Sequence, residues 1–317
     1  MKAVLHFNAS AALQERFNKA APDWLTIGYA DDHNTVAIER ELLDADVLLH
    51  VLSPVTSHLL GAARQLRLVQ KIGVGVNTID LAAARSRSIR VANMPGTNSQ
   101  AVSECALALM LAVLRKIVVL DAATRRGDGW RQPPEQMDDI GELSGRTVGL
   151  IGYGEVPRRL APVLEGLGAS VLFHARREVK GAIGRQVPLA TLLETADVVS
   201  LHVPLTDETK HLIDAAALAR MRRGTILINT ARGALVDERA LYRALANGHL
   251  RGAGLDVLDV EPAPAGNPLF DLSNLVVMPH VAWLTAETLN RSLAVVLENC
   301  SRLREGRPLL NEIEIAP

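Results

Sequence analysis

The sequence predicts an α/β fold: two Rossmann-like domains, each built on a parallel β-sheet and separated by an active-site cleft. Three observations lead to this prediction. Short aliphatic runs alternate with helical stretches along nearly the whole chain, which is the pattern of βαβ units and therefore of parallel strands. The length of 317 residues suits about two domains. Aromatic residues make up only 3% of the chain, so we expect aliphatic cores, as in sheets that helices cover on both faces.

Composition argues against several other classes of protein. A net charge of −1 with 48% hydrophobic residues excludes a disordered chain, because so much apolar surface collapses in water. The same charge balance argues against a nucleic-acid or membrane-surface partner, which needs a basic face. The most apolar window, Cys105–Leu114, is about half of a membrane span, and we expect no targeting segment. Two cysteines cannot form a disulfide scaffold, so the cytoplasm is the expected compartment. We expect no metal ion.

The first part of the chain predicts four buried strands, which are short runs rich in Val, Ile and Leu. They are Lys2–Phe7, Asp46–Leu52, Leu68–Ile72 and Ile89–Ala92. Between the last two, Thr78–Arg87 has helical periodicity, with Asp80 or Thr78 as its N-cap. A long, nearly all-apolar helix is predicted over Ala101–Leu120. Asp121–Gly145 then predicts a loop or projecting arm, either a solvated connector or a dimer contact.

A second and more regular alternation begins after Gly145. Its predicted strands are Thr147–Ile151, Ser170–His174, Asp197–Val203, Thr225–Asn229, Ala253–Val257 and Leu275–Met278. The last helix, Thr285–Arg304, could return to the first domain and make that domain discontinuous. We therefore expect a substrate-binding (lid) domain over residues 1–98 plus 286–317, and a dinucleotide-binding domain over residues 99–285.

A glycine turn follows the first strand of the second half. Gly152 and Gly154 stand between a strand and a predicted helix, which is the context that a dinucleotide fingerprint requires. Gly152 allows the tight turn, and Gly154 lets the backbone approach a pyrophosphate. The N–H groups of Glu155 and Val156 then point at the anion, helped by the helix dipole.

Two prolines depart from the usual fingerprint. Pro157 stands where the third glycine is expected, in the first helical turn, where the missing N–H of a proline is tolerated. Pro162 lies one turn further along, and we expect it to kink the helix.

The end of the next strand indicates which dinucleotide binds. An acid about 20 residues after the glycines would bind the ribose 2′-OH of NAD. Here Arg176 and Arg177 follow the strand, and no acid comes before Glu178. Guanidinium groups would attract a 2′-phosphate, so NADP(H) is predicted in preference to NAD. The alternative is that the two arginines are an ordinary basic pair on the surface.

Three later segments place polar residues after predicted strands, where open parallel sheets bind their ligands. Arg232 follows Thr225–Asn229, Glu261 follows Ala253–Val257, and His280 follows Leu275–Met278. Reduction of a ketone needs a proton donor for the carbonyl oxygen, and protonated His280 would be that general acid. Glu261 would stabilise the charged imidazole and fix its tautomer. Arg232 would hold a substrate carboxylate and polarise the keto group.

The run 145–283 resembles the D-isomer-specific 2-hydroxyacid dehydrogenase family. The resemblance rests on motifs that occur in order along the chain: Leu201–Thr206, Asn229–Gly233, Gly254–Val257 with Glu261-Pro262, and Pro279-His280. It implies that Arg232 binds the substrate, that Glu261 tunes the histidine and that His280 is the acid/base.

The resemblance also implies further contacts. Asp256 would meet the nicotinamide carboxamide, and Val203, Thr230 and Ala231 would line the cofactor. In the first domain, Lys71–Asn77 resembles the family's substrate loop, in which the N–H groups of Val74 and Gly75 would cradle the carboxylate. Trp283 could form a wall of the substrate pocket. Family habit suggests a homodimer through the cofactor domain.

Within the family, His174–Arg177 and Pro279–Trp283 look like glyoxylate/hydroxypyruvate reductases. Glu261 argues against formate dehydrogenases, which have an amide there, and Val74 argues against phosphite dehydrogenases, which have a lysine. The predicted activity is hydride transfer from NADPH to a small 2-ketoacid, giving the D-2-hydroxyacid. One alternative is an NAD-dependent D-2-hydroxyacid dehydrogenase with another substrate. The other is a corepressor-like binding protein that senses NAD(P)(H) without turnover.

Overall fold

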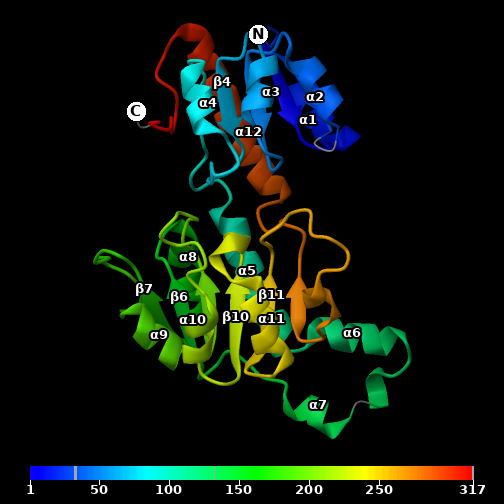
Figure 1. The fold of residues 1–317 in the computed structure, drawn as a ribbon, viewed down its shortest axis with the longest axis vertical. Helices are drawn as coiled ribbons and strands as arrows, with labels where there is room; N and C mark the ends of the chain where they lie inside the picture. The colour runs from blue at the N-terminus through cyan, green and yellow to red at the C-terminus, as the bar shows by residue number, and fades with distance from the viewer. Residues whose placement is uncertain (32–33, 132, 316–317) are drawn as a thin grey trace. The chain divides into compact units, whose positions relative to one another are not determined.

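The computed structural model describes residues 1–31, 34–131 and 133–315, and the chain forms two compact units (Figure 1). Unit 1 comprises Met1–Asn98 and Leu284–Pro317, and unit 2 comprises Ser99–Trp283. Each unit is built on its own sheet, and every strand pairing in both sheets is parallel. The predicted α/β class with two parallel sheets is confirmed.

Unit 1 has a five-stranded sheet in the order β2-β1-β3-β4-β5. Its strands are β1 (Lys2–His6), β2 (Thr26–Ala30), β3 (Val47–His50), β4 (Leu68–Lys71) and β5 (Arg90–Ala92). Its helices are α1 (Ala11–Ala20), α2 (Thr35–Leu42), α3 (Ser57–Ala62), α4 (Leu81–Ser86) and α12 (Ala286–Glu305). Of the two expected caps of α4, Asp80 makes the cap by accepting the N–H of Ala83.

The last helix, α12, belongs to unit 1 although it follows unit 2 in the chain. The fully buried Asn299 on α12 donates to the side chain of Gln70 on β4, with 2.6 Å between nitrogen and oxygen. A buried amide needs such partners, so this bond helps to fix α12 against the sheet.

Unit 2 has a seven-stranded sheet in the order β12-β11-β10-β9-β6-β7-β8. Its strands are β6 (Thr147–Ile151), β7 (Ser170–His174), β8 (Arg185–Gln186), β9 (Val198–Leu201), β10 (Thr225–Asn229), β11 (Leu250–Leu255) and β12 (Leu275–Val277). Its α-helices are α5 (Ser99–Leu114), α6 (Ile117–Arg125), α7 (Pro134–Asp138), α8 (Glu155–Gly166), α9 (Leu189–Thr195), α10 (Ala215–Arg220) and α11 (Glu238–Ala246). Short 3-10 turns are η1 (Gly129–Arg131), η2 (Gly233–Leu235) and η3 (Pro268–Asp271).

Alternate residues of the unit 2 strands enter two aliphatic cores. On one face, side chains such as Leu150 and Ile228 pack with α5 and α8. On the other face, neighbours such as Ile151 and Leu227 pack with α9, α10 and α11. Because both faces are covered, the strands are continuous apolar runs, which is why they could be recognised in the sequence. Among the described residues, no helix has the length and apolar character needed to cross a membrane.

Several predicted elements were wrong in detail. The long helix expected over Ala101–Leu120 ends at Leu114, and a second helix starts at Ile117. Lys116 between them has a left-handed φ of 52°, and Gly141 donates to the carbonyl of Leu114, so that the end of α5 is satisfied by another segment.

The segment Asp121–Gly145 is not only a loop, because it contains the end of α6, η1 and α7. Strands β2 and β8 were not expected: β2 includes Gly28 and an exposed Thr26, and β8 has two exposed residues. Helix α8 runs on to Gly166 through Pro162, so that this proline does not end it.

Candidate active site

The predicted site residues of unit 2 follow its parallel strands at their carboxyl ends. Gly152 follows β6, Thr230 follows β10, Asp256 follows β11 and His280 lies beyond β12. Because β12, β11, β10, β9 and β6 are neighbours in that order, these residues meet along one edge of the sheet.

The glycine turn after β6 is closely packed on one side and open on the other. Gly152 has a φ of +98°, and a Cβ there would lie 2.5 Å from the carbonyl oxygen of His202. Gly154 is the N-cap of α8 and has no side-chain cap, and a Cβ there would meet nothing within 4 Å. Open space above an uncapped helix N-terminus suits a phosphate group. Pro157 is buried in the first turn of that helix.

A second observation fits a bound dinucleotide. Thr230, after β10, has a buried hydroxyl for which the described residues provide no hydrogen-bond partner. A buried hydroxyl without a partner is unfavourable, so a ligand that supplies one is expected there. The neighbouring Ala231 and the half-buried Val203 pack against the apolar core below this edge. Together with the open glycine turn, these residues fit a dinucleotide cofactor.

The two arginines predicted to select NADP(H) lie after β7 and are exposed. The guanidinium of Arg176 lies 3.4 Å from a carboxylate oxygen of Glu208, and both side chains are largely in solvent. An exposed ion pair of this kind contributes little to the stability of the fold. Arg176 can therefore exchange Glu208 for another anion.

Arg232 is positioned by the turn that follows β10. The buried Asn229 donates its side-chain amide to the carbonyl of Arg232 at 2.8 Å and accepts the N–H of Ala231 at 3.0 Å. Gly233 permits the close approach of the next segment, since a Cβ there would lie 1.9 Å from the carbonyl carbon of Leu258. Burial lowers the pKa of Arg232, and the charge of Glu261 opposes this effect. A guanidinium remains protonated even so.

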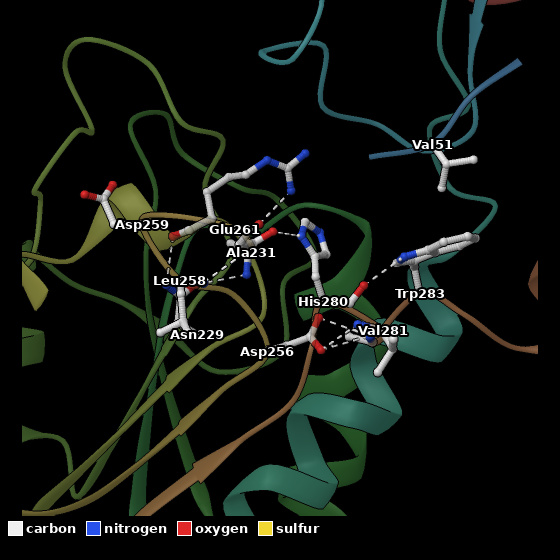
Figure 2. A network of polar contacts seen from close by, with 12 residues as sticks. Val51, Asn229, Ala231, Asp256, Leu258, Asp259, Glu261, His280, Val281 and Trp283 are labelled. Carbon is white, nitrogen blue, oxygen red and sulfur yellow. Dashed lines mark hydrogen bonds and ion pairs between the residues drawn. The ribbon is translucent and has the colours of Figure 1, made fainter. Parts of the chain in front are cut away.

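His280 and Glu261 form a direct pair. The Nδ1 atom of His280 lies 2.6 Å from Oε2 of Glu261, and Oε1 of Glu261 accepts the N–H of Leu258 at 2.9 Å (Figure 2). Burial tends to raise the pKa of Glu261, but the hydrogen bond and charge of His280 outweigh it, and the pKa lies below its ordinary value. Glu261 is therefore an anion that fixes which ring nitrogen of His280 points away from it.

The backbone around His280 is held by Asp256, a role that sequence reasoning missed. His280 has a left-handed φ of +57°, which is unfavourable for a residue with a side chain. Its N–H donates to the carbonyl of Asp256 at 2.7 Å. The buried carboxylate of Asp256 accepts the N–H groups of Val281 and Ala282 at 2.9 to 3.1 Å (Figure 2). Burial raises the pKa of Asp256, against the effect of these two N–H groups.

The other predicted site residues are divided between the two units. The carboxylate of Asp256 is engaged by the backbone, and its contact with a nicotinamide carboxamide stays a prediction. Trp283 is buried, and its indole N–H donates to the carbonyl of His280 at 3.1 Å. Val74 and Gly75 lie in unit 1 after β4, where the side chain of Asn93 donates to the carbonyl of Val74 at 2.8 Å. Their role as a carboxylate cradle stays a prediction.

Asn229, Gly233 and Asp256 hold the site residues in place. Each lies inside a motif that the sequence displays, so the signal was present. The partners of Asn229 are only two and three residues along the chain. Those of Gly233 and Asp256 come from other loops, and no local pattern indicates them.

The chain resembles known proteins over most of its length. A family model for the D-isomer specific 2-hydroxyacid dehydrogenase, NAD binding domain, matches residues 107–282. The chain is 40% identical over 277 residues to a glyoxylate reductase from Korarchaeum cryptofilum, covering 86% of this chain and 83% of that protein. It is 38% identical over 276 residues to a glycerate dehydrogenase from Methylorubrum extorquens, covering 86% of each.

Among solved structures, the TT0316 protein from Thermus thermophilus superposes with a TM-score of 0.88 at 36% identity, covering 99% of this chain and 100% of that one. The family match and the identity to these relatives indicate the same family as the motifs at the sheet edge. The chain belongs to the D-isomer-specific 2-hydroxyacid dehydrogenase family and is an oxidoreductase that uses a nicotinamide cofactor.

Proposed function

We propose that this enzyme reduces a small 2-ketoacid of the glyoxylate or hydroxypyruvate class with NADPH, giving the D-2-hydroxyacid. The observation that carries the proposal is the 2.6 Å contact between His280 Nδ1 and Glu261 Oε2, in the same unit as Arg232. Glyoxylate reductase and glycerate dehydrogenase among the similar proteins support the substrate class. Glycerate is the hydroxyacid that reduction of hydroxypyruvate yields.

The pair explains how a proton reaches the substrate. The nicotinamide, when bound, supplies the hydride. Glu261 occupies Nδ1 of His280, so the proton that His280 can donate is the one on Nε2. The carboxylate stabilises the imidazolium until transfer, and the transferred proton meets the negative charge that develops on the carbonyl oxygen.

Arg232 provides binding and polarisation. The Asn229 turn fixes its backbone, and its partly buried guanidinium donates to the carbonyl of Ala231 at 2.6 Å. Low dielectric there strengthens its attraction for an anion. A planar guanidinium can bind a carboxylate through two hydrogen bonds. This geometry favours 2-ketoacids over simple ketones, because only the acids offer the carboxylate.

The preference for NADPH rests on Arg176 and Arg177 at the end of β7. Both are exposed, and no acid stands at the position that would bind a ribose 2′-OH. The test is the ratio of kcat/KM for NADPH and NADH with one ketoacid. We expect NADPH to be used better, and Arg176→Asp to reverse the preference. Better use of NADH by the unmodified enzyme would overturn this part of the proposal.

Turnover tests the proposal as a whole. The purified protein is mixed with NADPH and a panel of small 2-ketoacids, and loss of the nicotinamide absorbance is followed. We expect turnover that His280→Ala abolishes while NADPH binding remains. If no ketoacid is reduced although NADPH binds, the protein is instead a sensor of the dinucleotide. Reduction of other ketoacids with NADH alone would indicate a different D-2-hydroxyacid dehydrogenase.

We also propose a homodimer through unit 2. Ile117 and Val118 on α6 are half exposed, and Trp130 on η1 is 90% exposed. Apolar side chains left in water in this number indicate a protein contact, and a second copy is the partner that the family suggests. Sedimentation of the wild-type protein should give the mass of a dimer, and Trp130→Ser should weaken it. A monomer at assay concentration would refute the proposal.

A further inference from the structure

The segment that carries Arg176 and Arg177 is held by two side chains outside it. We call residues 175–184, between β7 and β8, the arginine loop. The side-chain amide of Gln186 on β8 forms three hydrogen bonds with the backbone of the arginine loop. Nε2 donates to the carbonyls of Ala175 at 3.1 Å and Arg177 at 3.0 Å, and Oε1 accepts the N–H of Val179 at 3.2 Å. Gln186 thus bonds to the loop before, at and after the two arginines.

The other end of the loop is held from the glycine turn. The hydroxyl of Tyr153, which stands between Gly152 and Gly154, donates to the carbonyl of Ile183 at 2.7 Å. The same hydroxyl accepts the N–H of Ile183 at 2.8 Å. Its ring is buried and lies with its centroid 4.1 Å from that of Phe173 on β7. Tyr153 therefore connects the turn expected at the pyrophosphate with the loop expected at the ribose.

A fixed loop backbone lowers the conformational entropy that is lost when the two arginines bind a phosphate. Arg176 and Arg177 are exposed, flexible side chains, and a mobile backbone beneath them would add conformational entropy that binding must remove. Most of the loop is exposed, and Ala175, Val179 and Ala182 are the members that pack against the core. Neither arginine is among them, so the bonds from Gln186 to Ala175, Arg177 and Val179 add a direct restraint on the backbone that carries the two guanidinium groups.

We propose that Tyr153 and Gln186 are positioning residues for cofactor selectivity: they fix the arginine loop relative to the glycine turn, so that its guanidinium groups meet an adenosine 2′-phosphate. The inference rests on the proposed NADPH preference. Neither residue touches the 2′-phosphate in this account. A purely structural role would change the affinity for every adenine nucleotide alike, whereas a positioning role changes only the discrimination between them.

The experiment measures binding without turnover. Adenosine 2′,5′-bisphosphate and adenosine 5′-monophosphate differ only by the 2′-phosphate, and their affinities are determined by titration calorimetry. The proteins are the wild type, Tyr153→Phe, Gln186→Met and the control Tyr242→Phe. Tyr153→Phe keeps the ring on Phe173 and removes only the hydroxyl. Gln186 is exposed, so its replacement leaves the core intact. Tyr242 is a partly buried tyrosine on α11, on the opposite core.

We expect the wild type to prefer the bisphosphate. Each loop variant should then bind the bisphosphate about 5 to 20 times more weakly, as loss of preorganisation implies, and change the monophosphate affinity less than about twofold. The control should behave as wild type. If the wild type shows no preference, the NADPH assignment fails and this inference fails with it. If the wild type discriminates but the loop variants keep the same ratio, or lose both ligands equally, the inference alone is overturned.

Discussion

Glu261→Gln separates the electrostatic role of the carboxylate from its shape. Glutamine can keep one acceptor for the Leu258 N–H, now 2.9 Å from Oε1. Its NH₂ group would then face His280 Nδ1, now 2.6 Å from Oε2. That NH₂ donates, so it favours a neutral ring and opposes the imidazolium, whose Nδ1 also donates. The opposite rotamer would instead set the NH₂ against the Leu258 N–H.

The size of the effect follows from the geometry. A hydrogen bond to a charged group contributes about 1.5–3 kcal/mol. The Glu261 side chain is 35% exposed, so solvent screening places the loss near the lower end of that range. About 1.4 kcal/mol corresponds to a tenfold change in rate. The variant should therefore stabilise the imidazolium less by about this amount and reduce ketoacids about tenfold more slowly than the wild type.

The assay is kcat/KM for ketoacid reduction, measured for the wild type and the variant at the same pH. His280 must give up a proton as negative charge develops on the carbonyl oxygen, so Glu261→Gln should slow reduction about tenfold. Glu165→Gln, on α8, is the matched control. A wild-type kcat/KM in Glu261→Gln would refute the electrostatic role.

Three further predictions follow. In Gly233→Ala the new Cβ would lie 1.9 Å from the Leu258 carbonyl carbon, so we expect about 3 kcal/mol lower stability in urea unfolding, whereas Gly266→Ala, with nothing within 4 Å, should be close to neutral. Asp256→Ala leaves the N–H groups of Val281 and Ala282 without their acceptor. We expect the free energy of unfolding to fall by about 2 kcal/mol and ketoacid reduction to be lost; a wild-type kcat would contradict the role of Asp256 in positioning His280. The pKa of Glu261 is lowered in the folded protein, so its contribution to stability is present above its ordinary pKa and is lost as the pH falls through the folded value; the unfolding free energy of Glu261→Gln should decline less steeply with acid than that of the wild type.

Much of the architecture could be predicted because both sheets are covered. Strands β6, β7 and β10 have the residues expected of them, since a strand buried on both faces is an uninterrupted aliphatic run. The parallel arrangement then brings strand ends to one edge, so residues far apart in sequence, such as Arg232 and His280, could be assigned to one site. β2 was missed because it is an edge strand with Gly28 in it, and a half-exposed edge has no such signal.

The side-chain bonds that support the site could not be predicted in the same way. Gln186 reaches the arginine loop because it pairs with Phe173 across the sheet, and this register is a property of the folded pair of strands. Tyr153 meets Ile183 in the loop before β8, and the path of this loop is not indicated by the sequence. The break at Lys116 likewise depends on Gly141, which supplies the N–H that ends α5.

Asp256 and Glu261 follow the same strand, yet they act on different parts of His280. Asp256 is fully buried and binds backbone N–H groups, and burial raises its pKa. Glu261 is partly exposed and binds the ring, and the neighbouring imidazole keeps its pKa low. Two carboxylates whose pKa values move in opposite directions have different functions. The buried one maintains the left-handed backbone at His280, and the other binds Nδ1 of the ring at 2.6 Å. The short segment after β11 thus fixes both the backbone and the ring of the proposed acid.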